Sequence, residues 1–372
     1  MQPENTAVAC GSDLHRPQLT AADGSEPESA TLRKPQDVAT GLGSMVTRLR
    51  HLQLARFSGL YLWALIIAIF SIAVPSTFLT STTWDNIAAT QAITAIVAVG
   101  LLGALAAGSF DLSVGSNLGL AAIMCSWLTV NHHVNPVLGV MVTIAVGLLI
   151  GAVNAGLVVG IGIDSFIVTL GVSSILLAVT ELISQDRFIG PLPTSLQNFA
   201  NWRFLGLTGV VWYAIGIAIV VWTVLEHTAA GRRTAATGAN LEAARLSGVA
   251  TNRHRVVTLI VSATLASLAG ALVAARTGEV SSTIGAPYLL PAFSACFLGT
   301  TQLKPGRFNV WGTILALLLL GTGVAGLQLL GGQLWVSDMF TGTALVLAVA
   351  FAALGQKQRL SRLKKQTEAQ AA

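Results

Sequence analysis

Long apolar stretches recur along this chain and constrain its fold more than any other feature. A helix needs about 20 apolar residues to cross a bilayer. Stretches near this length, some a little shorter, lie at residues 58–74, 87–107, 113–130, 136–159, 165–183, 209–226, 256–275, 287–301, 309–329 and 336–354. Only 10% of the residues are charged, whereas soluble domains carry about 25%. The chain is therefore predicted to be an all-α, polytopic membrane protein with about ten transmembrane helices.

The positions of the lysines and arginines predict the orientation of these helices, because cytoplasmic loops are enriched in them. If the N-terminus is cytoplasmic, only Arg187, Arg203 and Arg276 of the 21 basic residues fall on the outer side. This distribution favours an even number of helices with both termini in the cytoplasm. The expected parts are a disordered tail at 1–57, a transmembrane domain at 58–355 and a basic cytoplasmic tail at 356–372.

Motifs for catalysis and metal binding are absent from the sequence. The chain contains no G-x-x-x-x-G-K-[ST] phosphate loop, no H-E-x-x-H and no G-x-S-x-G. Its three cysteines, Cys10, Cys125 and Cys296, are too few and too scattered for a disulfide framework or a metal site. We therefore expect no enzymatic activity, cofactor or metal ion in this chain. The net charge of +5 reports membrane topology, so no nucleic-acid partner is expected.

The largest expected cytoplasmic loop, residues 227–255, contains the polar stretch GANLEAARLSGVA. Asn240 is a suitable N-cap, and Gly248 suits the left-handed position that ends a helix. Glu242 in the first turn and Arg245 in the last turn agree with the helix dipole and are spaced to pair. A helix this short is marginal in water. We expect it to pack on the inner face of the membrane domain or in a partner's groove; an ordinary connecting loop is the alternative.

A second polar break, GSFDLSVGSNLG, separates two of the apolar stretches. Asp111 is expected to cap the following helix, with its carboxylate accepting N–H groups near Ser113 and Val114. A direct substrate or proton role for Asp111 is the alternative. Gly115 and Gly119 have the small-xxx-small spacing that lets helices approach closely.

Similar features recur in the next two stretches. Asp164 or Ser165 is expected to cap a helix. The pairs Gly147/Gly151 and Gly156/Gly160 are expected to mediate helix packing. Polar residues at mid-span are few, and the candidates for lining a solute path are Gln91, Asn117, Asn154, Thr169 and Ser173. Hydrogen bonding between helices is the alternative for each of them. Mid-span acids are scarce, which disfavours an ion-coupled carrier.

Four segments, in order, carry a family resemblance: GSFDLSVGSNLGL, SFIVTLGVSSILLAVT, GRRTAATGANLEAARLSGV and FLGTTQLKPGRFNVWGTILALLLLG. Together they resemble the hallmark segments of ABC-transporter permeases for monosaccharides, of the ribose, xylose and arabinose import type. This group lies within the wider family that includes branched-chain amino acid permeases. The resemblance implies a homodimeric or pseudo-dimeric, multi-pass permease of the bacterial inner membrane, in contact with membrane lipid. It also implies a periplasmic sugar-binding protein and a cytoplasmic ATPase as partners.

On this resemblance, the cytoplasmic loop corresponds to the family's coupling segment, which rests on the ATPase. The positions that match this segment are Gly231, Arg232, Arg233, Gly238, Asn240, Glu242, Arg245 and Gly248. Glycine-rich turns of the family are replaced here by Gly299-Thr-Thr-Gln and Lys304-Pro-Gly-Arg. The alternatives are a permease for another small polar solute, an ion-coupled secondary carrier and a membrane-embedded enzyme.

Overall fold

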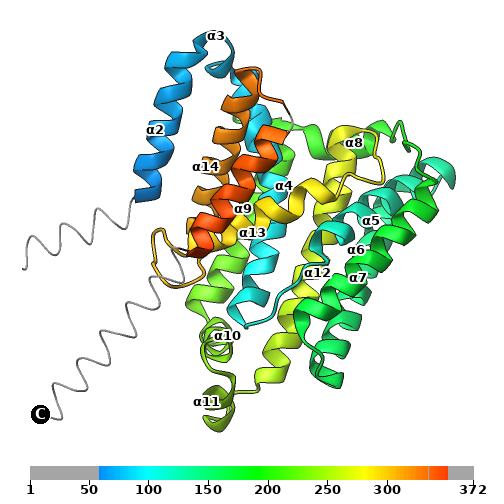
Figure 1. Ribbon diagram of the computed structural model, residues 1–372. Helices are drawn as coiled ribbons and strands as arrows, with labels where there is room; N and C mark the ends of the chain where they lie inside the picture. Colours follow the sequence, from blue (N-terminus) through cyan, green and yellow to red (C-terminus); the bar gives the residue numbers. More distant parts are fainter. Residues whose placement is uncertain (1–57, 334, 351–372) are drawn as a thin grey trace, which may run out of the picture. The chain divides into compact units, whose positions relative to one another are not determined.

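The structure, a computed structural model, describes residues 58–333 and 335–350. The expectations for the tails at 1–57 and 356–372 concern positions outside this part of the chain, as does Cys10. The described residues form helices joined by short connections (Figure 1). They are α2 (Ser58–Ala73), α3 (Pro75–Phe78), α4 (Ser81–Ala106), α5 (Val114–Ser126), α6 (Pro136–Ala155), α7 (Ser165–Ser184), α8 (Thr194–Asn201), α9 (Gly209–Trp222), α10 (Ala229–Ala239), α11 (Leu241–Leu246), α12 (Thr251–Thr277), α13 (Ala286–Gly299) and α14 (Val310–Leu329). A further helix covers Trp335–Ala350.

Three helices continue into short π-helical turns, and one small hairpin is present. The π-helical segments are η1 (Trp127–Asn131), η2 (Gly156–Ile161) and η3 (Thr223–His227), which follow α5, α6 and α9. Strands β1 (Arg203–Phe204) and β2 (Leu207–Thr208) pair in antiparallel register after α8, with Arg203 opposite Thr208. In Figure 1, α3 and α8 lie at one end of the long helices, and α10 and α11 lie at the other.

The all-α class is confirmed, whereas the number of spanning helices is confirmed only in part. Six helices in the described part of the chain are long and apolar enough to cross a membrane: α4, α6 with η2, α7, α9 with η3, α12 and α14. Three apolar helices are shorter: α2, α13 and Trp335–Ala350. Helix α5 has only 13 residues. Each predicted stretch therefore contains a helix, but ten full membrane spans are not shown.

Helices α4 and α12 form the centre of the packing. Helix α4 is buried at every position from Ala92 to Leu105, and α12 contacts α4, α5 and α6. A Cβ at Gly151 would lie 2.7 Å from Ile260 Cα, so the absence of a side chain lets α6 approach α12 closely. Gly147 faces Ser267 of α12 in the same way. This pair confirms the predicted packing role.

Gly156 and Gly160 do not share that role within the described part of the chain. Both lie in η2, and a Cβ at either position would meet no atom within 4 Å. The packing prediction for this pair was wrong for contacts among the described residues: both glycines are exposed, and η2 packs on α12 through the buried Val158, which clusters with Leu259. In contrast to α4, helices α6 and α7 expose many apolar side chains, among them Ile167 and Met141. Such side chains are suited to contact with lipid.

Candidate functional site

The polar segment predicted to hold one short helix holds two, α10 and α11. For α11 the predicted caps are confirmed: Asn240 Oδ1 accepts a hydrogen bond from Ala243 N at 3.0 Å. Gly248 has a φ of +79°, and the Val249 N–H donates to Ala244 O at 3.0 Å, which closes the helix in a Schellman motif. These local signals define a six-residue helix.

Helix α10 was not anticipated from the sequence. Thr228 is its N-cap, with Oγ1 accepting from Gly231 N at 3.4 Å, and this threonine was the available signal. Gly238 lies against the end of α4, since a Cβ there would overlap Ala106 O and lie 3.0 Å from Gly108 N. Thr234 Oγ1 lies 3.2 Å from His254 Nδ1 of α12. Helix α10 thus packs against two long helices, α4 and α12.

Helix α11, by contrast, is covered very little. Ala244 is its only buried residue, while Glu242 and Arg245 are exposed. The ion pairs in the described part of the chain are Arg203–Asp85 and Lys304–Glu226, so Glu242 and Arg245 do not pair. Leu246 has 88% of its surface exposed, and its chain neighbours Arg245 and Ser247 are exposed too. Within the α10–α11 segment, residues 229–248, α11 therefore presents an apolar side chain and charges that no element in the described part of the chain covers.

The α4–α5 connector, residues 107–113, buries its polar side chains, Ser109, Asp111 and Ser113, although Phe110 is exposed. Asp111 is fully buried, and its Oδ1 accepts hydrogen bonds from Ser113 N at 3.1 Å and from Ser113 Oγ at 2.6 Å. Helix α5 begins at Val114, with Ser113 as the N-cap residue. The expected bond from the Ser113 N–H is confirmed, and the carboxylate acts just ahead of the helix. Burial raises the pKa of the Asp111 carboxyl group, and Asp111 Oδ2 has no hydrogen-bond partner among the described residues.

Three other helices hold this connector in place. Ser165 Oγ and Thr169 Oγ1 of α7 accept hydrogen bonds from Phe110 N and Leu112 N, each at 3.0 Å. Asn154 Nδ2 of α6 donates to Ser113 Oγ at 2.9 Å, and Arg255 Nε of α12 donates to Ser109 Oγ at 3.1 Å. Side chains of α7 thereby satisfy two backbone N–H groups of a non-helical segment, and side chains of α6 and α12 bond its serine hydroxyl groups.

Two of the remaining predictions for this region are also resolved. Of the two candidate caps for α7, Asp164 is the N-cap, with Oδ1 accepting from Phe166 N at 2.9 Å. A Cβ at Gly115 would lie 3.0 Å from Leu289 Cβ, and one at Gly119 would lie 3.4 Å from Gly285 Cα. The close approach predicted for this glycine pair is confirmed, with α5 packed on the start of α13.

The five candidate pore-lining residues are not brought together. Asn117 is buried, and its amide donates to Ala263 O at 2.8 Å and accepts from Ser267 Oγ at 2.9 Å, both in α12. Asn154 and Thr169 bond the connector. Gln91 of α4 lies against Gly321 of α14, and Ser173 is half-buried on α7. A pore-lining role stays a prediction, and these contacts favour the interhelical alternative for the three buried residues.

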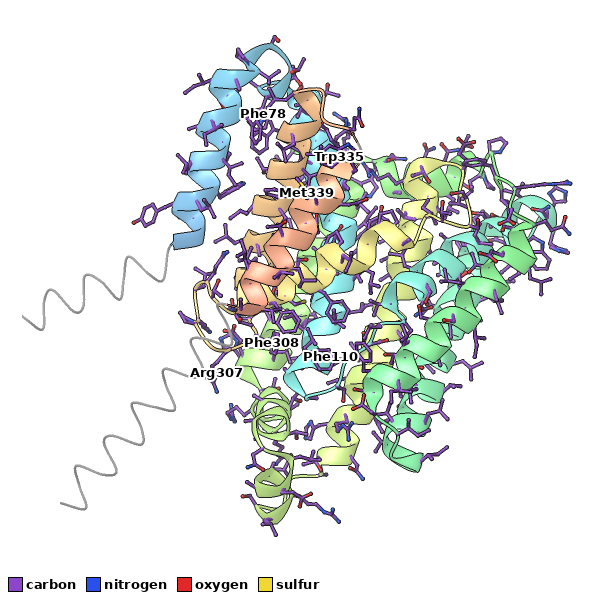
Figure 2. The ribbon with its side chains drawn as sticks, viewed as in Figure 1. Phe78, Phe110, Arg307, Phe308, Trp335 and Met339 are labelled. Atoms are coloured by element: carbon purple, nitrogen blue, oxygen red, sulfur yellow. The ribbon has the colours of Figure 1, made fainter. Side chains whose placement is uncertain are left out.

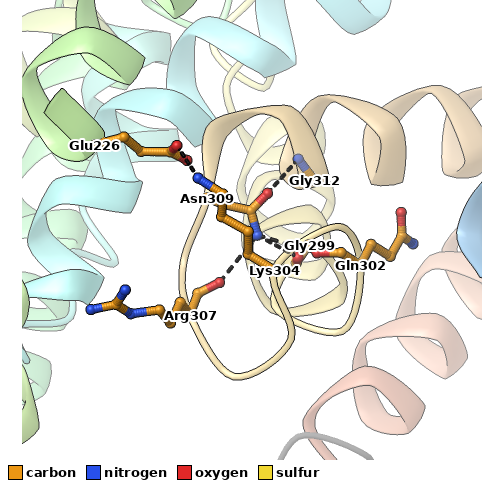
Figure 3. A network of polar contacts seen from close by, with 7 residues as sticks. All are labelled: Glu226, Gly299, Gln302, Lys304, Arg307, Asn309 and Gly312. Carbon is orange, nitrogen blue, oxygen red and sulfur yellow. Dashed lines mark hydrogen bonds and ion pairs between the residues drawn. The ribbon is translucent and has the colours of Figure 1, made fainter. Parts of the chain in front are cut away.

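The loop between α13 and α14, residues 300–309, lies at the same end of the helices as α10. Figure 2 places Arg307, Phe308 and Phe110 toward this end. Asn309 is the hub of the loop, with Nδ2 donating to Gly299 O at 2.9 Å and Oδ1 accepting from Gly312 N at 2.7 Å (Figure 3). Lys304 extends from the loop and pairs with Glu226 of η3. Sequence reasoning noted Lys304 only as a basic loop residue and missed this contact.

Comparison with known proteins identifies the family. Residues 83–349 match the family model described as "Branched-chain amino acid transport system / permease component". The chain belongs to this permease family. It is therefore a multi-pass, inner-membrane transport subunit of the ABC-importer type, which confirms the resemblance found in the sequence.

Three similar proteins illustrate the relationship. The ribose import permease protein RbsC of Escherichia coli (strain K12) is 33% identical over 288 residues, covering 76% of this chain and 89% of its own. The D-allose transport system permease protein AlsC of the same strain is 28% identical over 296 residues, covering 79% and 90%. The autoinducer 2 import system permease protein LsrD of Yersinia enterocolitica is 30% identical over 260 residues, covering 68% and 78%. No solved structure matches.

Proposed function

We propose that this permease carries a monosaccharide across the membrane and that a separate cytoplasmic ATPase docks on the α10–α11 segment to drive the transport. The observation that carries the docking proposal is Leu246, an apolar side chain that is 88% exposed beside the charged residues of α11. Burial of a leucine side chain against a partner removes apolar surface from water and contributes about 1.5–3 kcal/mol. Because α10 is seated on α4 and α12, a push on α11 would reach both helices.

The orientation and the other partners belong to the same proposal. The basic residues of the α10–α11 segment and of the α13–α14 loop favour a cytoplasmic position for this end of the helices. A periplasmic sugar-binding protein would then deliver the solute at the opposite end, which carries α8 and the β1–β2 hairpin. We propose a homodimer as the transporting unit, as the family resemblance implies. Neighbouring reading frames are expected to encode a phosphate-loop ATPase and a secreted binding protein.

A second candidate function has an observation of its own. The LsrD protein imports autoinducer 2, by its name, and is about as similar to this chain as the ribose and allose permeases are. The solute can therefore be a small polar molecule other than a common monosaccharide. A calorimetric screen of the cognate binding protein against sugars and other small polar solutes separates the two candidates, since the permease receives its solute from that protein.

The docking proposal is tested with Leu246→Asp in the full complex. We expect the ATPase to be lost from the purified complex, because a charge would replace the apolar anchor. Leu205→Asp is a matched control: Leu205 is 77% exposed and lies in the hairpin turn after α8. That variant should retain the ATPase. Retention of the ATPase by Leu246→Asp would refute the docking proposal.

A further inference from the structure

The ion pair between Glu226 and Lys304 joins two parts of the chain that are 78 residues apart. We propose that it is a positioning contact that couples movement of the α10–α11 segment to helices α13 and α14. This inference rests on the proposed function, because it assigns a role to residues next to the surface on which the ATPase would dock. Neither residue belongs to that surface itself: Glu226 lies in η3, before α10, and Lys304 lies in the α13–α14 loop.

Glu226 is tied closely to the start of α10. Thr228 Oγ1 donates to Val224 O at 2.6 Å while it caps α10 through Gly231 N. A Cβ at Gly231 would overlap the carbonyl group of Leu225, so α10 folds directly back against η3 with no intervening side chain. A displacement of α10 toward or away from the membrane therefore has to move the Glu226 carboxylate as well.

Lys304 is tied equally closely to α13 and α14. The Asn309 side chain is buried, and its Nδ2 bonds the last residue of α13, Gly299, and also Gln302 O at 3.3 Å. Its Oδ1 bonds Gly312 N in the first turn of α14. Because one amide group joins both helix ends and the loop between them, the loop that carries Lys304 follows these helices as a unit (Figure 3).

The position of the pair argues against a mainly stabilising role. The Lys304 side chain is 50% exposed and that of Glu226 is 17% exposed, so solvent screens the pair from the lysine side, and solvent-screened ion pairs contribute little to folding stability. Packing between the same helices is already supplied by Trp222 of α9 and Trp311 of α14, with ring centroids 5.9 Å apart. The ion pair adds a charge-specific link between the base of α10 and the loop. Opposite charges fix register more than they add affinity.

The test uses charge exchange in the full complex, with the permease, its ATPase and its binding protein reconstituted in liposomes. The variants are Lys304→Glu, Glu226→Lys and the double exchange. The matched control is Arg307→Glu, which makes the same change of charge in the same loop; the Arg307 side chain is exposed and forms no ion pair among the described residues. Coupling between sites typically corresponds to about 5–150-fold. We expect each single variant to lower the solute transported per ATP hydrolysed by about fivefold or more.

The double exchange should restore most of this ratio, and Arg307→Glu should leave it unchanged. Failure of the double exchange to rescue, an equal loss in Arg307→Glu, or unchanged transport in both single variants would overturn the inference. Loss of the ATPase from the Lys304→Glu complex would overturn it too, because the pair would then belong to the docking surface. The failure of the docking proposal is recognised separately, by an ATPase that remains bound to Leu246→Asp.

Discussion

The α4–α5 connector and the α10–α11 segment are both polar breaks between apolar helices, but they differ in burial: the polar side chains of the connector are buried, whereas most of α11 is exposed. In the connector, Asp111 is fully buried, and side chains from α6, α7 and α12 form hydrogen bonds with the neighbouring residues of the connector. In the α10–α11 segment, Asn240 and Gly248 cap α11 locally, and the helix exposes Leu246. Both have a side-chain acceptor ahead of a short helix. The difference between the two breaks is coverage by other helices in the described part of the chain: these helices cover the polar side chains of the connector and leave α11 exposed.

The largest expected effect tests the buried side of this comparison. Asp111→Leu removes the acceptor of two Ser113 hydrogen bonds inside the protein. Each of the two Ser113 groups left without an acceptor costs about 1–3 kcal/mol. We expect the midpoint of thermal unfolding in detergent to fall strongly, with loss of uptake in cells.

Asp164→Leu is the matched control, because Asp164 also caps a helix but is exposed. Loss of an exposed N-cap typically costs about 1 kcal/mol. We therefore expect Asp164→Leu to lower the unfolding midpoint less than Asp111→Leu does, because Asp164 is exposed and Asp111 is buried. Equal unfolding midpoints for the two variants would show that burial of Asp111 does not distinguish the connector.

An intermediate effect is expected at the glycines of the α10–α11 segment. Gly238→Ala would bring a Cβ into the backbone of Ala106 at the end of α4. Overpacking of this kind costs about 1–3 kcal/mol. Here it would push α10 away from the end of α4. We expect reduced uptake, with the ATPase still bound through α11. Gly248→Ala is the control: its φ of +79° makes alanine unfavourable, but a Cβ there meets nothing within 4 Å. If Gly248→Ala lowers uptake as much as Gly238→Ala, the close contact of α10 with α4 does not explain the loss of uptake.

The same comparison shows which features can be predicted from sequence. The caps at Asn240 and Gly248 depend on residues within one or two helical turns, so their residue types were sufficient. Helix α10 was missed because AAGRRTAATGA has no apolar face, and its position depends on backbone contact at Gly231 and Gly238. The hydrogen-bond partners of the connector could not be predicted from local sequence, because they are distant along the chain: Ser165 bonds Phe110 across 55 residues. The polarity of Thr169 made it a pore candidate, a role that stays a prediction, but nothing in the sequence indicated that its hydroxyl group accepts a hydrogen bond from Leu112 N, 57 residues away.

The smallest expected effect concerns the pH dependence of stability. Burial raises the pKa of the Asp111 carboxyl group above that of a free aspartate side chain, so the folded state retains a proton that the unfolded state releases. The stability that this proton contributes is fully present below the unfolded pKa and is lost as the pH rises through the raised folded pKa. Asp111→Asn keeps an acceptor for Ser113 and cannot ionise. We therefore expect its unfolding midpoint to be close to that of the unmodified chain in mild acid and higher at alkaline pH.

Asp164→Asn, at an exposed cap, should show no such divergence. Parallel pH profiles for Asp111→Asn and the unmodified chain would mean that Asp111 is ionised in the folded connector, stabilised instead by the N-terminal dipole of α5.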